Sequence, residues 1–403
     1  MSSFKNFYIQ LFVATSLMGF WLTNALCTYL IGDTSSSVSI AYRALLMIMS
    51  VIAIIICRND IRIDNSPFFK WYILIMGLYA FRIIYDAAFG PFADILPISA
   101  FITNFLYTVV GVFFTTFAII TCRNNLNLDT ICKLTYIIGL VTIILVPYIV
   151  DLESLSMENT TERMDAGRGL STLSLAKVGA IEVIVAIHLL LNNRLKILYL
   201  PGLILGIWLC LSSGSRGGFV SLIIALGVYC IIRYRHNILL SLILISSIIL
   251  VALNLESILE WLSEYFPVFS NRMLDTIIYN DQSGREELRE MAYQHIMDNP
   301  LLGYSYRLNP TETGYYCHNG LLDIFLTFGI PFGLICIYIT HIKPLIMVYK
   351  LIDYKNLFFV SIMPLWVIIH SFSGIGFTDI TFSLAICIMA AYYYSYTKQY
   401  KRH

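Results

Sequence analysis

Three polar segments of this 403-residue sequence carry side chains that could bind or transfer a charged group. In the first, "LCLSSGSRGGFVSL" (209–222), Arg216 stands in a Gly- and Ser-rich tip between two apolar runs. Successive backbone N–H groups in such a turn can form a concave anion site, and a planar guanidinium matches the oxygens of a phosphate. Ser215 and Gly217 would let a ligand approach the backbone closely. The alternative is a tight hairpin whose arginine contacts lipid headgroups.

The second segment is "DQSGREELREMAYQHIMDNPLLGY" (281–304), which predicts a helix. Ser283 or Gly284 is expected to cap it and Pro300 to end it. Arg285 and Arg289 are four residues apart and therefore share a helical face. A separate apolar stripe is formed by Leu288, Met291, Ala292 and Ile296. The alternative to a binding role is an amphipathic helix lying on the membrane surface.

The third segment, "TETGYYCHNGLLDIFLTFGIPFGL" (311–334), changes from polar to apolar just after His318. A histidine changes charge near neutral pH, so it can act as a base, an acid or a hydrogen-bond donor. Asn319 is expected to cap the helix that follows, with Asp323 about one turn further on. Taken alone, the position of His318 favours a hydrogen-bonded histidine at the membrane interface over a catalytic one.

Composition defines the class of protein. The chain is 58% hydrophobic and 13% charged, with a mean hydropathy of +0.76. Because soluble domains keep about a quarter of their residues charged, this chain is predicted to be an integral membrane protein. A net charge of +1 without a basic cluster gives no support for nucleic-acid binding. The sequence contains no phosphate-binding loop and no paired histidines at metal-ligand spacing, so neither a metal nor a nucleotide cofactor is expected. Eight of the nine cysteines lie in or at the ends of apolar runs and are predicted to pack as small apolar side chains, whereas Cys317 lies in a polar loop.

The predicted fold is all-α and polytopic, with about twelve transmembrane helices and one large periplasmic loop between spans 9 and 10. A span needs about 20 apolar residues. The predicted spans are 7–31, 37–57, 68–90, 98–121, 132–150, 170–191, 196–212, 217–233, 237–255, 320–341, 357–373 and 378–397. This divides the chain into spans 1–9 (1–255), a loop with short amphipathic helices (256–319), and spans 10–12 with a tail (320–403).

Most of the 26 lysines and arginines fall in the segments that share a side with the N-terminus, which predicts that both termini are cytoplasmic. The first apolar run lacks a cleavage site and is expected to remain as a helix. The outside segments are then 151–169, the tip 212–218 and the loop 256–319. A loop of that last length is usually functional.

Charged side chains inside spans are costly unless they are paired or face a cavity. Arg82 and Asp86 are spaced to pair within one helix, whereas Lys177 and Glu182 are predicted to line a wet cavity. Arg43 and Asp323 also fall within or at the edge of predicted spans.

The order "SGSRGG", "GREELREMAYQHIMDNPLLGY" and "HNGLLDIFLTFGIPFGL" resembles the bacterial O-antigen polymerase (Wzy-type) and O-antigen ligase superfamily of polytopic membrane glycosyltransferases, over roughly residues 160–340. The resemblance implies a GT-C-like, metal-independent transferase at the periplasmic face of the inner membrane. Its donor would be a glycan on undecaprenyl pyrophosphate. Arg216 and Arg285 match the family arginines that contact the pyrophosphate, and His318 matches the histidine that activates the acceptor hydroxyl. Where the family often has Pro-Asn, this sequence reads "LSLAK" (173–177).

On the same resemblance, the substrate contacts are expected from Arg289, Ser215, Gly217, Asn319 and Tyr304. The motifs favour a polymerase of O-antigen or capsule repeat units, with a chain-length regulator and a flippase as implied partners. The alternative within the superfamily is a ligase that moves the finished glycan to lipid A–core. A lipid-linked oligosaccharide transporter is the alternative from another class, although the two halves of the sequence show no correspondence.

Overall fold

The computed structural model describes residues 2–32, 36–58, 66–150, 170–278, 285–309 and 316–400. Within these ranges the chain is helical, with no β-strand. The predicted all-α, multi-pass membrane fold is confirmed. The predicted outside loop 151–169 and the predicted cap at Ser283 or Gly284 lie outside the described residues.

All twelve predicted spans are helical, and several are continuous helices. These are α1 (Ser2–Ile31), α2 (Ser36–Ile56), α3 (Pro67–Phe89), α6 (Leu128–Leu145), α7 (Thr172–Asn192), α9 (Arg216–Arg233), α10 (Ile238–Leu253), α16 (Phe358–Ser371) and α17 (Ile380–Tyr400). The others are compound: α4 (Ile98–Leu106), the π-helix η2 (Tyr107–Phe113) and α5 (Phe114–Cys122); η6 (Lys196–Tyr199) and α8 (Leu200–Ser212); and α14 (Gly320–Ile337), η7 (Tyr338–Ile342) and α15 (Lys343–Leu351).

The predicted number of crossings is not confirmed. Among the described residues, eight helices are long and apolar enough to cross a membrane. A ninth crossing would need α10 and α11 (Leu255–Ser263) to count as one, although they are bent by 64°. Three further apolar helices, Lys196–Ser212, Phe358–Ser371 and Ile380–Tyr396, are shorter than the roughly 20 residues that a bilayer core requires.

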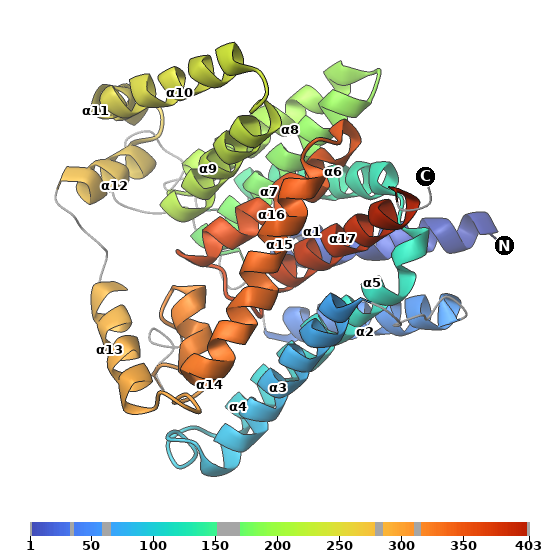
Figure 1. The fold of residues 1–403 in the computed structure, drawn as a ribbon, viewed down its shortest axis with the longest axis vertical. Helices are drawn as coiled ribbons and strands as arrows, with labels where there is room; N and C mark the ends of the chain where they lie inside the picture. Colours follow the sequence, from blue (N-terminus) through green and yellow to red (C-terminus); the bar gives the residue numbers. More distant parts are fainter. Residues whose placement is uncertain are drawn as a thin grey trace.

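The helices form a bundle (Figure 1). The start of α1 and the end of α17 lie on one side of the molecule, whereas α12 (Pro267–Ile278) and α13 (Arg285–Asp298) lie on the opposite side. The helices α2, α4, α7, α9, α14 and α17 all begin at the end near α12 and α13. The first turns of these six helices therefore meet at one end of the bundle.

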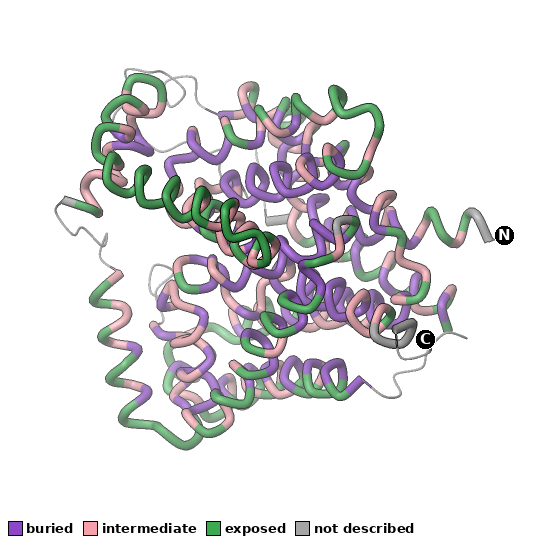
Figure 2. Tube along the Cα trace, turned by 45° about the horizontal axis from the view of Figure 1, so that its top comes forward, coloured by how far each residue is buried: buried purple, intermediate pink, exposed green. Residues whose placement is uncertain are grey.

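Helix α7 is the buried centre of the bundle and packs on α6, α8 and α16. It approaches α8 closely, because a Cβ on Gly179 would lie only 2.6 Å from the carbonyl oxygen of Gly206. Small residues permit such close contacts between membrane helices. By contrast, α10 has no buried residue and is exposed along its length (Figure 2), which suits an apolar helix that faces lipid.

Helix α13 packs against the protein through the predicted apolar stripe. Ala292 and Ile296 are buried in a cluster with Leu308, Cys317 and Leu326, and Leu288 and Met291 pack against it. The helix ends at Asp298, as Pro300 predicts. Gly329 (φ 71°) breaks α14, and Ile330 next to it donates its N–H to the carbonyl of Pro300 at 2.7 Å. The apolar stripe of α13 is therefore covered by α14 and its preceding segment.

The predicted Arg82–Asp86 ion pair is confirmed, with 2.8 Å between Nε and Oδ1. Arg82 also donates to the carbonyls of Leu302 (2.7 Å) and Tyr304 (2.5 Å). Asp86 accepts from the hydroxyl of Ser305 at 2.9 Å. The hydrogen bonds of this pair therefore hold the segment after α13 against α3.

Candidate functional site

The Gly- and Ser-rich tip is held against α12 by two arginines. Arg216, the first residue of α9, donates from Nη1 to the carbonyl of Arg272 at 2.7 Å and to the hydroxyl of Thr276. In return, Arg272 donates to the carbonyl of Gly214 at 2.6 Å. Gly214 has a φ of 65°, a conformation that favours glycine, so the turn depends on this residue type. These contacts fix the guanidinium of Arg216 beside the tip.

Arg285 reaches the connection between α16 and α17, which spans residues 372–379. Its Nη1 donates to the carbonyl of Ser373 at 3.0 Å. The same connection touches the start of α9, because a Cβ on Gly217 would lie 2.8 Å from the hydroxyl oxygen of Ser373. The first residues of α9 and α13 therefore meet at one short segment.

His318 lies at the same connection. Gly320, two residues further on, packs so tightly that a Cβ would lie 3.2 Å from the carbonyl of Ser371 and 3.3 Å from that of Ile375. His318 is the only non-glycine residue among those described with a positive φ, of 53°. Such a backbone costs about 1–3 kcal/mol and clusters at functional sites. The imidazole contacts the ring of Tyr316, with 4.3 Å between centroids.

The environment of His318 keeps its imidazole neutral. Burial, and after it the positive charges of Arg285 and Arg289, together lower its pKa to about 4. Its Nδ1 is buried and has no hydrogen-bond partner in the described part of the chain. A neutral imidazole with an unpartnered nitrogen is suited to accept a proton from a ligand at neutral pH.

The structure thus brings Arg285 and His318 together beside Ser371–Ile375. Gly217 packs on the same segment, while the guanidinium of its neighbour Arg216 points to α12. From the sequence alone, no role is predicted for this connection, "FSGIGFTD" (372–379). The signal that could have revealed it is a pair of glycines and an acidic residue in a short link on the predicted outside. Because Ser373 accepts from Arg285 through its backbone, its side-chain type gave no indication of the contact.

The other expected contact residues have structural roles in this arrangement. Asn319 caps α14 as predicted, since its carboxamide oxygen accepts from the N–H groups of Leu321 (3.0 Å) and Leu322 (3.3 Å). The ring of Tyr304 stacks on His295 with 3.9 Å between centroids, which places it in the packing of α13. Ser215 is the N-cap residue of α9.

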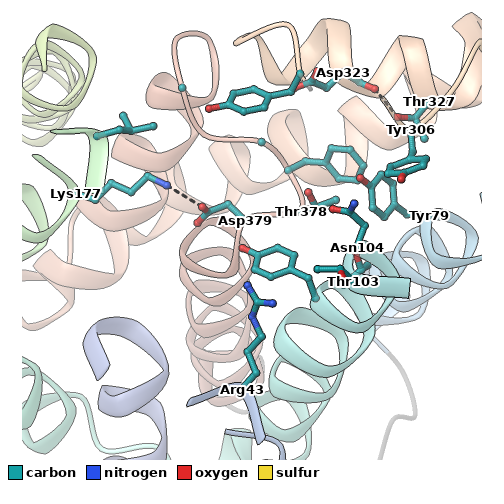
Figure 3. Close-up of a pocket in the computed structure, with 17 residues that line it drawn as sticks. Arg43, Tyr79, Thr103, Asn104, Lys177, Tyr306, Asp323, Thr327, Thr378 and Asp379 are labelled. Carbon is teal, nitrogen blue, oxygen red and sulfur yellow. Dashed lines mark hydrogen bonds and ion pairs between the residues drawn. The ribbon is translucent and has the colours of Figure 1, made fainter. Parts of the chain in front are cut away.

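A polar cavity of about 350 Å³ adjoins this cluster (Figure 3). Tyr316 and Gly374 line it, and each is close in sequence to a residue of the cluster. Across the cavity, Lys177 of α7 pairs with Asp379 at 2.8 Å. Burial alone would raise the pKa of Asp379, but the ammonium of Lys177 and the hydrogen bonds hold that pKa below its ordinary value.

The prediction that Lys177 lines a cavity is therefore confirmed, whereas the prediction for Glu182 is not confirmed. Glu182 is fully buried and lines neither this cavity nor its neighbour. A Cβ on Gly202 of α8 would lie 2.5 Å from Glu182 Oε1. Five residues separate Lys177 from Glu182, which turns the two side chains to different faces of α7.

The fold and this cluster define the class: a multi-pass membrane protein with cationic groups and a neutral histidine gathered at one end of its bundle. Comparison with known families then gives a more specific result. The model of the O-antigen ligase family matches residues 201–338. The match contains Arg216, Arg285 and His318, and it confirms the resemblance to the O-antigen polymerase and ligase superfamily. No curated protein matches the chain. In the described residues, no three His, Cys, Asp or Glu side chains form a group that could hold a metal ion.

Proposed function

We propose that this protein is an O-antigen or capsular polysaccharide polymerase. It would join undecaprenyl-pyrophosphate-linked repeat units at the periplasmic face of the bacterial inner membrane, with both termini in the cytoplasm. The observation that carries the proposal is the meeting of Arg285 and His318 beside Ser371–Ile375, the segment on which Gly217, next to Arg216, also packs. The family match over 201–338 supports glycosyl transfer.

In this mechanism the two arginines bind the donor pyrophosphate. Both guanidiniums now donate to neutral carbonyl oxygens, Arg216 to Arg272 and Arg285 to Ser373. Pyrophosphate oxygens are stronger acceptors, so a bound donor would share or replace these contacts. The two positive charges would then stabilise the negative charge that develops as the pyrophosphate leaves, without requiring a metal ion.

His318 is the general base in the same step. The acceptor hydroxyl oxygen attacks the anomeric carbon, and the bond from that carbon to the pyrophosphate oxygen breaks. The electron pair leaves with undecaprenyl pyrophosphate, and the hydroxyl proton passes to Nδ1 of His318. The buried, unpartnered state of Nδ1 and the low pKa of His318 both support this role, because the imidazole is neutral before the step.

The ligase is the second candidate, and the name of the matching family favours it: its model is described as O-antigen ligase. In that case the acceptor would be lipid A–core instead of a second lipid-linked glycan. The chemistry at Arg216, Arg285 and His318 would be the same. The choice of polymerase rests on the "SGSRGG" and "HNGLLDIFLTFG" motifs, and on this choice a chain-length regulator and a flippase would act with the protein.

The test is a deletion strain complemented with wild type, Arg216→Ala, Arg285→Ala or His318→Ala at matched protein levels. Surface glycan is resolved on gels, and lipid-linked intermediates are extracted. A polymerase predicts lipid A–core that carries a single repeat in the deletion strain and in all three variants. Unmodified core together with long lipid-linked glycan would instead identify the ligase. Normal ladders from all three variants would overturn the mechanism and favour a lipid-linked oligosaccharide transporter.

A further inference from the structure

The cavity beside the candidate site contains a cation, Arg43, that has no ionic partner among the described residues. Arg43 lies on α2, and its guanidinium points toward the interior of the cavity on the side of Asp379 (Figure 3). It stands 4.8 Å from the ring centroid of Tyr107 and forms no ion pair with any described residue. Lys177 and Asp379 neutralise each other, so Arg43 adds positive charge at this end of the cavity. The other carboxylate of the lining, Asp323, lies at the opposite end of the cavity (Figure 3) and accepts from the N–H and the Sγ of Cys317.

Arg43 also lines both of two neighbouring cavities. A second cavity of about 190 Å³ shares Arg43, Tyr107, Lys177 and Asp379 with the first. An arginine within a membrane span is costly unless it is paired or meets water or a ligand, and such residues usually mark substrate paths. The position of Arg43 in both linings therefore points to an anionic group that enters this space.

The remaining lining has the chemistry that recognises a sugar. Tyr79, Tyr107, Tyr306 and Tyr316 present aromatic rings, whose faces can pack on the C–H groups of a pyranose. Thr103, Asn104, Thr108, Thr327 and Thr378 add hydroxyl and amide groups that both donate and accept hydrogen bonds. A volume of about 350 Å³ lies in the range of small-molecule sites.

The cavity is connected to the cluster around Ser371–Ile375 through two of its own lining residues. Tyr316 lines the cavity and contacts the imidazole of His318. Gly374 lines it and follows Ser373, the acceptor of the Arg285 hydrogen bond. A glycan whose reacting end lay at His318 could therefore extend a neighbouring sugar past Tyr316 toward Arg43.

We propose that this cavity binds a sugar carrying an anionic substituent, with Arg43 paired to that substituent and the tyrosines packed on the ring. The substituent is a carboxylate or a phosphate ester, both of which present oxygens that a guanidinium binds in the same way. This inference rests on the proposed function for the identity of the glycan. The inference adds that the glycan is acidic and that the cavity lined by Arg43 binds its acidic sugar in preference to a neutral one.

The experiment measures binding of a lipid-free oligosaccharide to the full-length protein in detergent by calorimetry. The probe is the repeat-unit oligosaccharide released by partial hydrolysis from the surface polysaccharide of the host strain. It lacks pyrophosphate, so binding does not require Arg216 or Arg285. We expect wild type to bind it, Arg43→Gln to bind it at least about tenfold more weakly, and Arg43→Lys to fall between them. Arg194→Gln, at an exposed position in the connection after α7, is the matched control and should bind like wild type.

A second arm changes the ligand instead of the protein, so it does not depend on how a variant folds. Reduction of the carboxyl groups, or removal of phosphate esters with hydrofluoric acid, should weaken binding to wild type as much as Arg43→Gln does. The treatment that succeeds identifies the substituent. A surface polysaccharide without acidic groups, no binding by wild type, or equal binding by Arg43→Gln or by the neutralised probe would each overturn the proposal.

The failures of the two proposals are distinguishable. Normal glycan ladders from the Arg216, Arg285 and His318 variants, together with Arg43-dependent binding of the acidic probe, would reject the transfer mechanism and retain the sugar site. Loss of the ladders in those variants with Arg43-independent binding would do the opposite.

Discussion

Arg82 and Arg43 are both arginines inside membrane-spanning helices, but their interaction partners differ. Arg82 is paired with Asp86 and donates to backbone carbonyls of the segment after α13. Arg43 lies over the ring of Tyr107, forms no ion pair with any described residue and lines two cavities. The contrast distinguishes a polar group that stabilises the fold, Arg82, from a polar group that we propose binds a ligand, Arg43. The predictions below test this distinction.

The largest predicted effect is the difference in stability between Arg82→Met and Arg43→Met. Arg82→Met leaves Asp86 buried without its cation and should lower the free energy of unfolding by about 3–5 kcal/mol. Arg43→Met removes only a cation–π contact and should cost about 1 kcal/mol or less. Unfolding of both variants in the same mixed micelles measures the difference. Equal losses would show that Arg43 is a structural residue after all.

His318 should be important for activity and unimportant for stability. His318→Ala and His318→Gly should both lower the transfer rate by about a hundredfold or more, because each removes the proposed base. The glycine variant should be more stable than the alanine variant by about 1 kcal/mol, since glycine adopts the positive φ without strain. Rates with lipid-linked repeat units extracted from the deletion strain, together with unfolding curves, test both statements. A His318→Gly variant that keeps its activity would exclude the imidazole as the base.

The pH dependence of the rate should report the cations around His318. Because burial and the two arginines lower the pKa of His318 to about 4, wild type should retain its base as the pH falls from 7 to 5. Arg289→Gln removes one positive charge, which makes the imidazolium less unfavourable and raises the pKa. The acidic limb of its pH–rate profile should therefore move to higher pH while staying below the ordinary value of about 6.5, since burial remains. Arg194→Gln is the control. An unchanged limb in Arg289→Gln would contradict the electrostatic account.

The same distinction explains how much the sequence could predict. The Arg82–Asp86 pair, the cap at Asn319 and the apolar stripe of α13 were predictable because their partners lie within a few residues on one helix. Arg43 has Ser39, Ile40, Leu46 and Met47 at helical spacing, so its helix offers no ionic partner. The sequence therefore shows that Arg43 has no ionic partner on its own helix, but it does not show which residues surround Arg43.

The cavity could not be predicted, because its lining comes from α2, α3, α4, α7, α14 and the 372–379 connection, which meet only in the packed bundle. The total of twelve crossings is not confirmed for a related reason: apolar composition does not fix the length of each helix.

Two glycines of α9 provide the most sensitive comparison between the site and the scaffold. A Cβ on Gly217 would lie 2.8 Å from the hydroxyl oxygen of Ser373 and 3.2 Å from the ring of His370, whereas a Cβ on Gly227 would meet nothing within 4 Å. Gly227→Ala should therefore stabilise the protein by up to about 1 kcal/mol through the higher helix propensity of alanine, and leave the transfer rate unchanged. Gly217→Ala should not stabilise the protein in this way, because the added methyl group displaces Ser373. It should also lower the transfer rate, because the carbonyl of Ser373 accepts from Arg285. The same rate in both variants would show that the connection between α16 and α17 does not position Arg285 for the reaction.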